Sequence, residues 1–471
     1  MDPQKKLPIR SRFWFKKHVE PPKNGKIFDQ ITIVYSIVLA VLSFAIFWPI
    51  ISKIEFEEAF FTPLVPFLIN LLSAYGIGAS DTVRVIFIIS SITATVGLYL
   101  FVRDLTKRQI VPILSALVFL IPHVPVGVLT FLKNDLSELI STRSFFTIAY
   151  GDGAQILALA ILPFAAISFI RYLREPKNIY LILSVILSSL VLLINRSQAV
   201  NLFLVLGVLA LTEFFLELNK DKFVGFFRVV FLSLGLVAFW YTPSFWVESY
   251  QLLATQIIEN IKFLFPLPFI IITLSLVFSF IFFARRSERQ PIFIAFLLFI
   301  IFLSIILSWF LSGYSFIPHP HRLVPNLIMF GAIVAALILT SIIDSLRIVE
   351  KLNFEYLKIQ LKIAGAVVFG VTSFVVLVAV AYTIFPYAVG LISGPSGFWT
   401  KVRESVVADR NGRITLADGN FKLVQLNVGV WQQYLGSGLS LLFLIYLVTL
   451  YVNRRETVVR FMNSVDEIKT T

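Results

Sequence analysis

The chain has 471 residues, of which 58% are hydrophobic and only 14% are charged, and it contains no cysteine. This composition has too much apolar surface for a soluble domain, so lipid is the expected solvent. The lack of cysteine excludes disulfides, thiolate nucleophiles and cysteine-ligated metals. The formal charge of +13 comes from short basic clusters that cap hydrophobic runs. That placement favours lipid headgroups, and not nucleic acid, as the partner.

The hydrophobic runs predict an all-α polytopic membrane protein of about twelve transmembrane helices. The first span covers Ile31–Ile51. The next run, Phe60–Tyr75, is too short for a span and is expected to lie along the outer membrane surface. The remaining spans are predicted at Val83–Val102, Ile110–Phe131, Gly153–Ile170, Ile179–Ile194, Ala199–Leu218, Val224–Trp240, Phe263–Ala284, Ile292–Leu311, Leu323–Ile343, Ile363–Ile392 and Leu439–Tyr451.

The regions between these spans complete the predicted organisation. The four residues Asn195–Gln198 join two spans so closely that we expect a helical hairpin. Asp418-Gly419 indicates a two-residue turn within a small extracytoplasmic hairpin region. The predicted regions are a cytoplasmic tail over 1–30, a membrane domain over 31–392 with outer loops at 52–82 and 132–152, the extracytoplasmic segment 393–436, the last span 437–453 and a second cytoplasmic tail over 454–471.

The distribution of charge predicts the orientation. With both termini in the cytoplasm, 28 Lys and Arg fall on the cytoplasmic side and 12 outside, against 15 and 12 Asp and Glu. The whole net charge then lies on the cytoplasmic face, as the positive-inside rule requires. The outer face is electrically balanced, so chemistry on that side has to use its few ionisable residues.

The first candidate group on the outer face is acidic: Glu55, Glu57 and Glu58 directly follow the first span. Clustered carboxylates at a membrane interface tend to have a raised pKa, which suits a general base that takes a proton from an acceptor hydroxyl. The alternative interpretation is a solvated acidic loop.

The second group is His319, His321 and Arg322, in the motif His-Pro-His-Arg at the start of a span. An arginine and two histidines at the outer headgroup level suit a lipid phosphate or pyrophosphate, whose developing negative charge they would stabilise. Arg84 and Arg196, also at outer span ends, are weaker phosphate-binding candidates. The alternative is that Arg322 only reaches toward headgroups and the histidines make ordinary interfacial hydrogen bonds.

The third group is Asp135, Glu138 and Asp152, in or beside the second outer loop. Together with the first-loop glutamates they could hold a divalent cation such as Mg²⁺ or Mn²⁺, because hard cations take carboxylate oxygens. Their spacing matches no specific metal motif, and the alternative is that they line the acceptor side of a site.

The order of these parts resembles the glycosyltransferase C superfamily. The resemblance rests on the acidic loop after the first span, the proline-containing helix Thr62–Leu68, Asp81–Arg84 opening a span and Tyr99–Leu105 ending it. The rest is similar to prokaryotic membrane proteins labelled as related to 6-pyruvoyl-tetrahydropterin synthase. The motifs that carry this second similarity are Gly151–Ala154, Ala238–Pro243, His321–Pro325, Gly412–Ile414 and Gln433–Gly436.

The resemblance implies a multi-pass inverting glycosyltransferase in the plasma membrane of a prokaryote. Such an enzyme transfers a sugar from a polyprenyl-phosphate donor to an extracytoplasmic acceptor, which is a cell-envelope glycan, a lipid or a protein. It implies that Glu57 or Glu58, where superfamily members usually carry Asp, is the catalytic base. Two other functions remain open: a secondary transporter or lipid-linked oligosaccharide flippase, and a non-catalytic scaffold of the same fold. A transporter should carry ionisable residues near the bilayer midplane, whereas almost every charge here lies at a span end.

The predicted orientation can be tested with single cysteines introduced into this cysteine-free chain. A membrane-impermeant thiol reagent added from outside intact cells should label Ser52→Cys, in the first outer loop, and should not label Ser287→Cys, in a cytoplasmic loop. The reverse pattern of labelling would show that the orientation is inverted.

Overall fold

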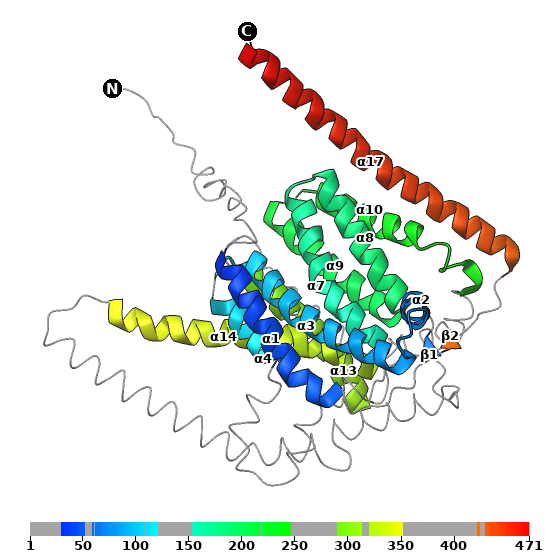
Figure 1. Ribbon diagram of the computed structural model, residues 1–471. Coiled ribbons are helices and arrows are strands. Elements are labelled where there is room, and N and C mark those ends of the chain that lie inside the picture. The colour runs from blue at the N-terminus through cyan, green and yellow to red at the C-terminus, as the bar shows by residue number, and fades with distance from the viewer. Residues whose placement is uncertain are drawn as a thin grey trace, which may run out of the picture.

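The fold is known from a computed structural model that describes residues 30–51, 59–60, 62–108, 110–120, 153–217, 219–245, 290–312, 320–351, 422–423 and 429–470. These residues are almost entirely helical (Figure 1). The helices are α1 (Gln30–Ile51), α2 (Leu64–Ser73), α3 (Ala79–Thr106), α4 (Ile110–Leu120), α7 (Gly153–Arg174), α8 (Asn178–Ile194), α9 (Ser197–Glu217), α10 (Asp221–Leu236), α13 (Gln290–Ser312), the 3-10 turn η2 (Pro320–Leu323), α14 (Val324–Lys351) and α17 (Val430–Thr470).

Within the described residues, six helices are long and apolar enough to cross a membrane. Their apolar parts are Gln30–Trp48, Ala79–Thr106, Ala154–Arg174, Gln198–Glu217, Gln290–Phe310 and Val430–Val452. The helical, multi-pass membrane character predicted from the sequence is therefore confirmed. The total of about twelve spans stays a prediction, because the runs at 263–284 and 363–392 lie outside the described residues.

Other predicted elements can be compared directly with the structure. The short run after the first span forms the ten-residue helix α2, which packs on α3 and α8. The tight joint before Gln198 links α8 to α9, as the predicted helical hairpin requires. The tail before residue 30 and the turn at Asp418-Gly419 lie outside the described residues.

The last predicted span is much shorter than the helix that contains it. Helix α17 begins at Val430, nine residues before the predicted start at Leu439. The pair Gly436 and Gly438 has the composition of a helix boundary, but Gly436 is needed for packing instead. A Cβ on Gly436 would lie 2.5 Å from the backbone oxygen of Ala238, so only glycine lets α17 approach the end of α10 this closely.

The predicted span Val224–Trp240 ends early, because α10 stops at Leu236 and the chain then turns. Tertiary hydrogen bonds hold this turn. The Tyr241 hydroxyl donates to the carbonyl oxygen of Leu192 at 2.6 Å, and the Phe239 amide donates to Ser440 Oγ at 2.9 Å.

Helix α7 is the centre of the described bundle. It packs against α3, α8 and α9, while α1 and α4 add to α3. Helix α13 packs against α9 and α14, and α14 also packs on α4 (Figure 1). The α3–α7 contact is close, since a Cβ on Gly97 would lie 2.7 Å from Phe164 Cε2. Small residues at helix crossings are typical of membrane bundles, where close packing drives association.

Several buried hydroxyl groups inside these apolar helices bond to their own backbone. The hydroxyls of Ser90, Ser91, Thr95 and Ser115 each donate to the carbonyl four residues earlier, at 2.6 to 3.0 Å. Such bonds satisfy a hydroxyl without another helix, which is important where no water is present. These serines and threonines are therefore compatible with spanning helices.

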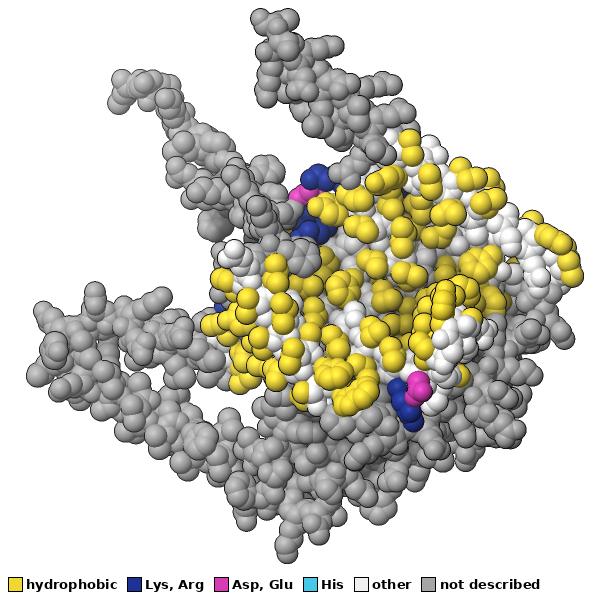
Figure 2. All heavy atoms as spheres, in the orientation of Figure 1, with side chains coloured by type: hydrophobic (Ala, Val, Ile, Leu, Met, Phe, Trp, Pro, Cys, Tyr) yellow, Lys and Arg dark blue, Asp and Glu magenta, His cyan; other side chains and the backbone are white. Residues whose placement is uncertain are grey.

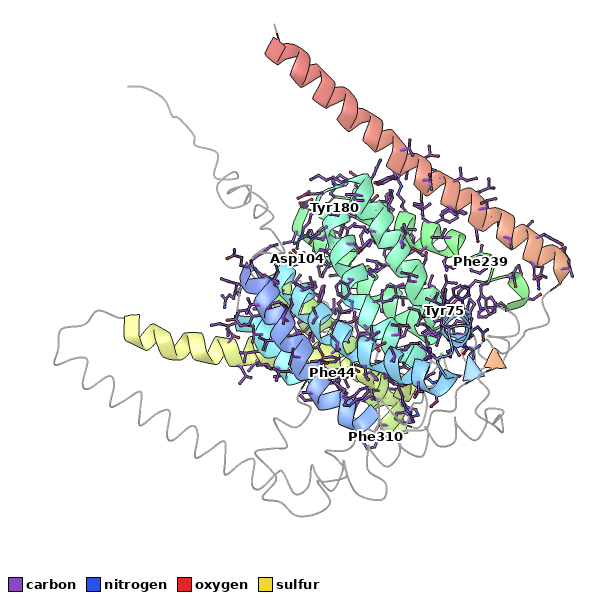
Figure 3. All side chains as sticks on the ribbon, in the orientation of Figure 1. Phe44, Tyr75, Asp104, Tyr180, Phe239 and Phe310 are labelled. Atoms are coloured by element: carbon purple, nitrogen blue, oxygen red, sulfur yellow. The ribbon has the colours of Figure 1, made fainter. Side chains whose placement is uncertain are left out.

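Charged side chains lie at the two ends of the bundle. Between Arg84 and Arg103, α3 carries no charge over about 28 Å, close to the hydrocarbon thickness of about 30 Å. Figure 2 shows a mostly hydrophobic surface between two small groups of charge. Asp104 and Tyr180 lie at one end of the bundle, and Tyr75 and Phe310 lie at the other (Figure 3).

The end that carries Asp104, which we call the charged end, is held by buried ion pairs. The Arg171 guanidinium of α7 donates to Asp104 of α3 at 2.9 Å. One turn along α7, Arg174 donates to Glu213 of α9 at 2.9 Å and to Gln290 of α13 at 2.9 Å. The amide of Gln290 in turn donates to Glu213 at 2.6 Å. Four helices are thereby fixed to one another at this end.

Removing the Glu213 carboxylate should destabilise the bundle strongly. Glu213 has 2% of its side chain exposed, so Glu213→Ala leaves Arg174 and Gln290 without their shared acceptor in a low-dielectric site. We expect a loss of about 3–5 kcal/mol in the free energy of unfolding. The measurement is unfolding of the purified protein in detergent, followed by circular dichroism.

The matched control is Glu175→Ala, at the same end of the bundle. Glu175 pairs with Lys177 at 2.6 Å, but the side chains are 30% and 58% exposed. The expected loss is below about 1 kcal/mol, since water replaces such a partner. Equal losses for the two variants would contradict the structural role given to Glu213.

Candidate functional site at the amide end

The opposite end of the bundle contains a buried cluster of amide side chains. The Asn201 amide nitrogen donates to Gln198 Oε1 at 2.9 Å and to Asn326 Oδ1 at 3.1 Å. Gln198 and Asn326 also bond to each other at 3.4 Å. All three side chains are at most 1% exposed. The cluster joins the first turn of α9 to the first turn of α14.

A fourth amide connects this group to the central helix. Gln155, near the start of α7 and 1% exposed, donates from Nε2 to the backbone oxygen of Arg322 at 2.5 Å. We call Gln155, Gln198, Asn201 and Asn326 the amide cluster, and this end of the bundle the amide end. Two of its acceptor atoms, Gln155 Oε1 and Asn201 Oδ1, are buried without a hydrogen-bond partner.

Two arginines lie at the helix starts that the amide cluster joins. Arg196 immediately precedes α9, and Arg322 lies in η2, just before α14; both side chains are half-buried. The N-terminal ends of α9 and α14 carry the positive ends of their helix dipoles. Basic side chains beside helix N-termini favour the binding of an anion such as phosphate.

The segment that follows the acidic loop is attached at the same place. The Thr62 hydroxyl, 3% exposed, donates to the carbonyl oxygen of Ile194 at 2.6 Å, two residues before Arg196. The two-residue strand β1 (Ala59–Phe60) pairs in parallel with β2 (Lys422–Leu423). The predicted outer loop 52–82 is therefore attached to the amide end through Thr62, and its strand β1 pairs with β2 of the predicted outer segment 393–436.

The structure brings together only some of the residues predicted from the sequence. Arg196 and Arg322 each lie at one of the two joined helix starts, whereas Arg84 forms an ion pair with Asp81 of its own helix at 2.8 Å. The backbone of His321 is part of η2, but its side chain lies outside the described residues. The other candidates, all outside the described residues, are Glu55, Glu57, Glu58, Asp135, Glu138, Asp152 and His319.

The predicted divalent-cation site involves these same undescribed carboxylates. Among the described residues there is no group of three or more His, Asp or Glu that could hold a metal ion. The Mg²⁺ or Mn²⁺ site stays a prediction.

The amide cluster is the part of the site that the motifs did not reveal. Its members occupy ordinary sequence contexts, such as Gly-Ala-Gln-Ile for Gln155 and Val-Pro-Asn-Leu for Asn326. The available signal was position: each amide lies in the first turns of an apolar helix with the same predicted orientation. A polar residue inside a membrane segment usually faces the bundle interior and finds a partner there.

Comparison with known protein families, curated proteins and solved structures finds no match for this chain. The chemistry of the site is therefore inferred from its own residues and geometry.

Replacing Asn326 with leucine should weaken the joint between α9 and α14. The change leaves the amides of Gln198 and Asn201 without one of their partners. Each hydrogen bond between membrane helices contributes about 0.6–2 kcal/mol to stability, depending on the method of measurement. We expect Asn326→Leu to lower the free energy of unfolding by about 1–2 kcal/mol in detergent.

Thr340→Val is the matched control on the same helix. The Thr340 hydroxyl is buried but donates only to the carbonyl oxygen of Ala336 within α14, at 2.7 Å. Its loss leaves no side chain of another helix unpaired, so the expected effect is below about 0.5 kcal/mol. If the two variants unfold alike, the amide cluster does not join the helices as described.

Proposed function

We propose that the chain is a membrane glycosyltransferase, which transfers a sugar from a polyprenyl-phosphate donor to an extracytoplasmic acceptor at the amide end. The observation that supports this function most is the pairing of two helix starts, each with an arginine, over a buried polar cluster. The phosphate of a lipid-linked sugar lies in the headgroup plane. An enzyme with that donor has reason to be embedded in the bilayer with its anion-binding groups at one membrane face.

Arg196 and Arg322 are assigned the donor phosphate, with His319 and His321 beside Arg322 in the chain. Glu57 or Glu58 is assigned the role of base. The carboxylate takes the proton of the acceptor hydroxyl as its oxygen attacks the anomeric carbon of the sugar. The bond from that carbon to the phosphate oxygen breaks, and polyprenyl phosphate leaves with the electron pair. The arginines stabilise the charge that develops on the leaving phosphate.

The amide cluster is assigned a positioning role. Its side chains are at most 1% exposed, so they hold the two helix starts in place and do not contact a donor directly in this conformation. Because the cluster is neutral, it places no carboxylate beside the phosphate. The hydrogen bond of the Thr62 hydroxyl to Ile194 attaches the segment that follows Glu58 to the end of α8, beside Arg196 in the chain. The proposal thus places the base and the phosphate-binding arginines near one another.

The proposal requires the amide end to face outward and the charged end to face the cytoplasm, in the inner membrane of a prokaryote. The described basic residues support this, since they are concentrated at the charged end. Among the described side chains, the charge that lies well inside an apolar helix is Arg228 of α10, and it is exposed on the outside of the bundle and not in the interior where a transport site would lie. That distribution favours the enzyme over a transporter or flippase.

Arginine and glutamate variants test the proposed roles by different kinetic signatures. With purified protein, a polyprenyl-phosphate sugar and a suitable acceptor, Glu57→Gln combined with Glu58→Gln should lower kcat by about 10²–10⁴-fold. Arg322→Gln and Arg196→Gln should each lower kcat/KM by about 10²-fold or more, since each removes stabilisation of the leaving phosphate.

Lys177→Gln, an exposed charge change at the opposite end of the bundle, is the control and should leave turnover unchanged. Unchanged turnover in the double glutamate variant would remove the assignment of the base. No turnover with any donor, together with intact donor binding, would favour the non-catalytic scaffold. Movement of the labelled lipid across a vesicle membrane without sugar transfer would favour a flippase.

A further inference from the structure

Arg228 is an exposed cation on an apolar side of α10 at the charged end. It lies seven residues after the start of the helix at Asp221, which is about 10 Å along the helix axis. Val224 and Phe231, four residues before and three after, lie on the same face and are 62% and 67% exposed. Phe227 beside it is 64% exposed. Such a face is suited to lipid chains, and Arg228 is the one charge on this part of α10.

No described carboxylate pairs with Arg228. Its Nη1 donates to the hydroxyl of Tyr172 on α7 at 3.5 Å, the outer limit of a hydrogen bond. By contrast, Arg171, Arg174 and Lys177 at the same end all pair with carboxylates. Arg228 therefore keeps most of its five donor positions for a partner that is not an acidic side chain of the described bundle.

Helix α17 crosses beside Arg228. On one side of the arginine, Phe443 of α17 packs edge-on against Phe231, with ring centroids 5.3 Å apart. On the other side, the Asn178 amide donates to the carbonyl oxygen of Leu450 at 3.4 Å. These two attachments hold residues 443–450 of α17 beside the arginine. Arg228 thus lies beside the phenol of Tyr172, at the crossing of α10 and α17, and is exposed on the outside of the bundle.

We propose that Arg228, with Tyr172, binds the phosphate of an anionic phospholipid between α10 and α17 in the leaflet at the charged end. The guanidinium donates to the phosphate oxygens. The Tyr172 hydroxyl, which accepts from Arg228, has its own proton to donate to the same phosphate. Phe227 and Val224 provide an apolar surface for the acyl chains. This site is independent of the proposed sugar transfer at the other end of the bundle.

An anionic lipid is preferred over a zwitterionic one because of net charge. A lipid such as phosphatidylglycerol brings one uncompensated negative charge, whereas phosphatidylcholine carries its own ammonium group. One basic side chain near the membrane surface raises the affinity for anionic lipid by about fivefold. A side chain that only reaches toward bulk headgroups would show no such retention of one lipid after the others are removed.

The test measures lipid retained by the purified full-length protein in detergent, by native mass spectrometry after limited delipidation. Phosphatidylglycerol should be retained at least about fivefold more than phosphatidylcholine, and Arg228→Gln should remove that preference. Lys220→Gln, an exposed residue just before α10 with the same charge change, should leave the preference intact. Soluble glycerol phosphate should not compete, since it lacks acyl chains.

Three results would overturn the proposal: equal retention of the two lipids, an unchanged preference in Arg228→Gln, or an equal loss in Lys220→Gln. Circular dichroism of each variant confirms that the helices are intact. A second variant, Tyr172→Phe, removes only the hydroxyl group and leaves the charge of the site unchanged. Tyr172→Phe should lower retention by a smaller factor than Arg228→Gln, because the arginine remains. Sugar-transfer activity is not a readout of this experiment, so failure of either proposal leaves the other unaffected.

Discussion

The requirement that buried charges be paired determines how the described helices are arranged. Arg171 and Arg174 lie on the central helix, and each meets a carboxylate that is almost fully buried, at 2.9 Å. A charge in this environment has no water to compensate it, so a shift of any of these helices along its axis would separate a pair. The ion pairs therefore fix the relative height of α3, α7 and α9, and the hydrogen bonds of Gln290 add α13 to them. Because helices are stiff rods, they fix the height of the opposite ends as well.

The two ends of the bundle use different chemistry for the same purpose. At the charged end, full charges hold the helices and neutralise one another. At the amide end, neutral amides hold α9, α14 and α7, and no carboxylate belongs to the amide cluster. An anion that approaches the amide end therefore meets dipoles and arginines, without a buried negative charge in the structure that supports them. This difference is the physical basis for assigning a phosphate to that end.

The sequence was sufficient to predict most helices, since long apolar runs and tight joints are local signals. Helices α1, α3, α7, α8, α9 and α13 begin and end within a few residues of the predicted spans. The early end of α10 was not predictable in this way, because the turn after it depends on Tyr241 and Leu192, 49 residues apart. Likewise, a glycine such as Gly436 is typical of a helix end, but here it lies inside α17 at the contact with Ala238.

The candidate site was predicted less completely than the fold. Arg196 and Arg322 could be selected because few basic residues are predicted to face outward, but the joining of their two helix starts depends on Gln198 meeting Asn326, 128 residues away. One sequence does not say which buried amide bonds to which. The ion pair between Asp104 and Arg171 was hidden for the same reason, since the residues around Asp104 have the composition of a simple basic cap.

The attachment of α17 has a consequence for how the protein is assembled during synthesis. Only 17% of its apolar segment is buried, and its fit depends on glycines at the crossing with α10 and on a few hydrogen bonds. Helices α3, α7, α8 and α9 are made earlier and bury far more of their surface in one another. They can therefore form a complete bundle before the ribosome reaches residue 430. Helix α17 then enters the bilayer on its own hydrophobicity and docks onto a surface that already exists.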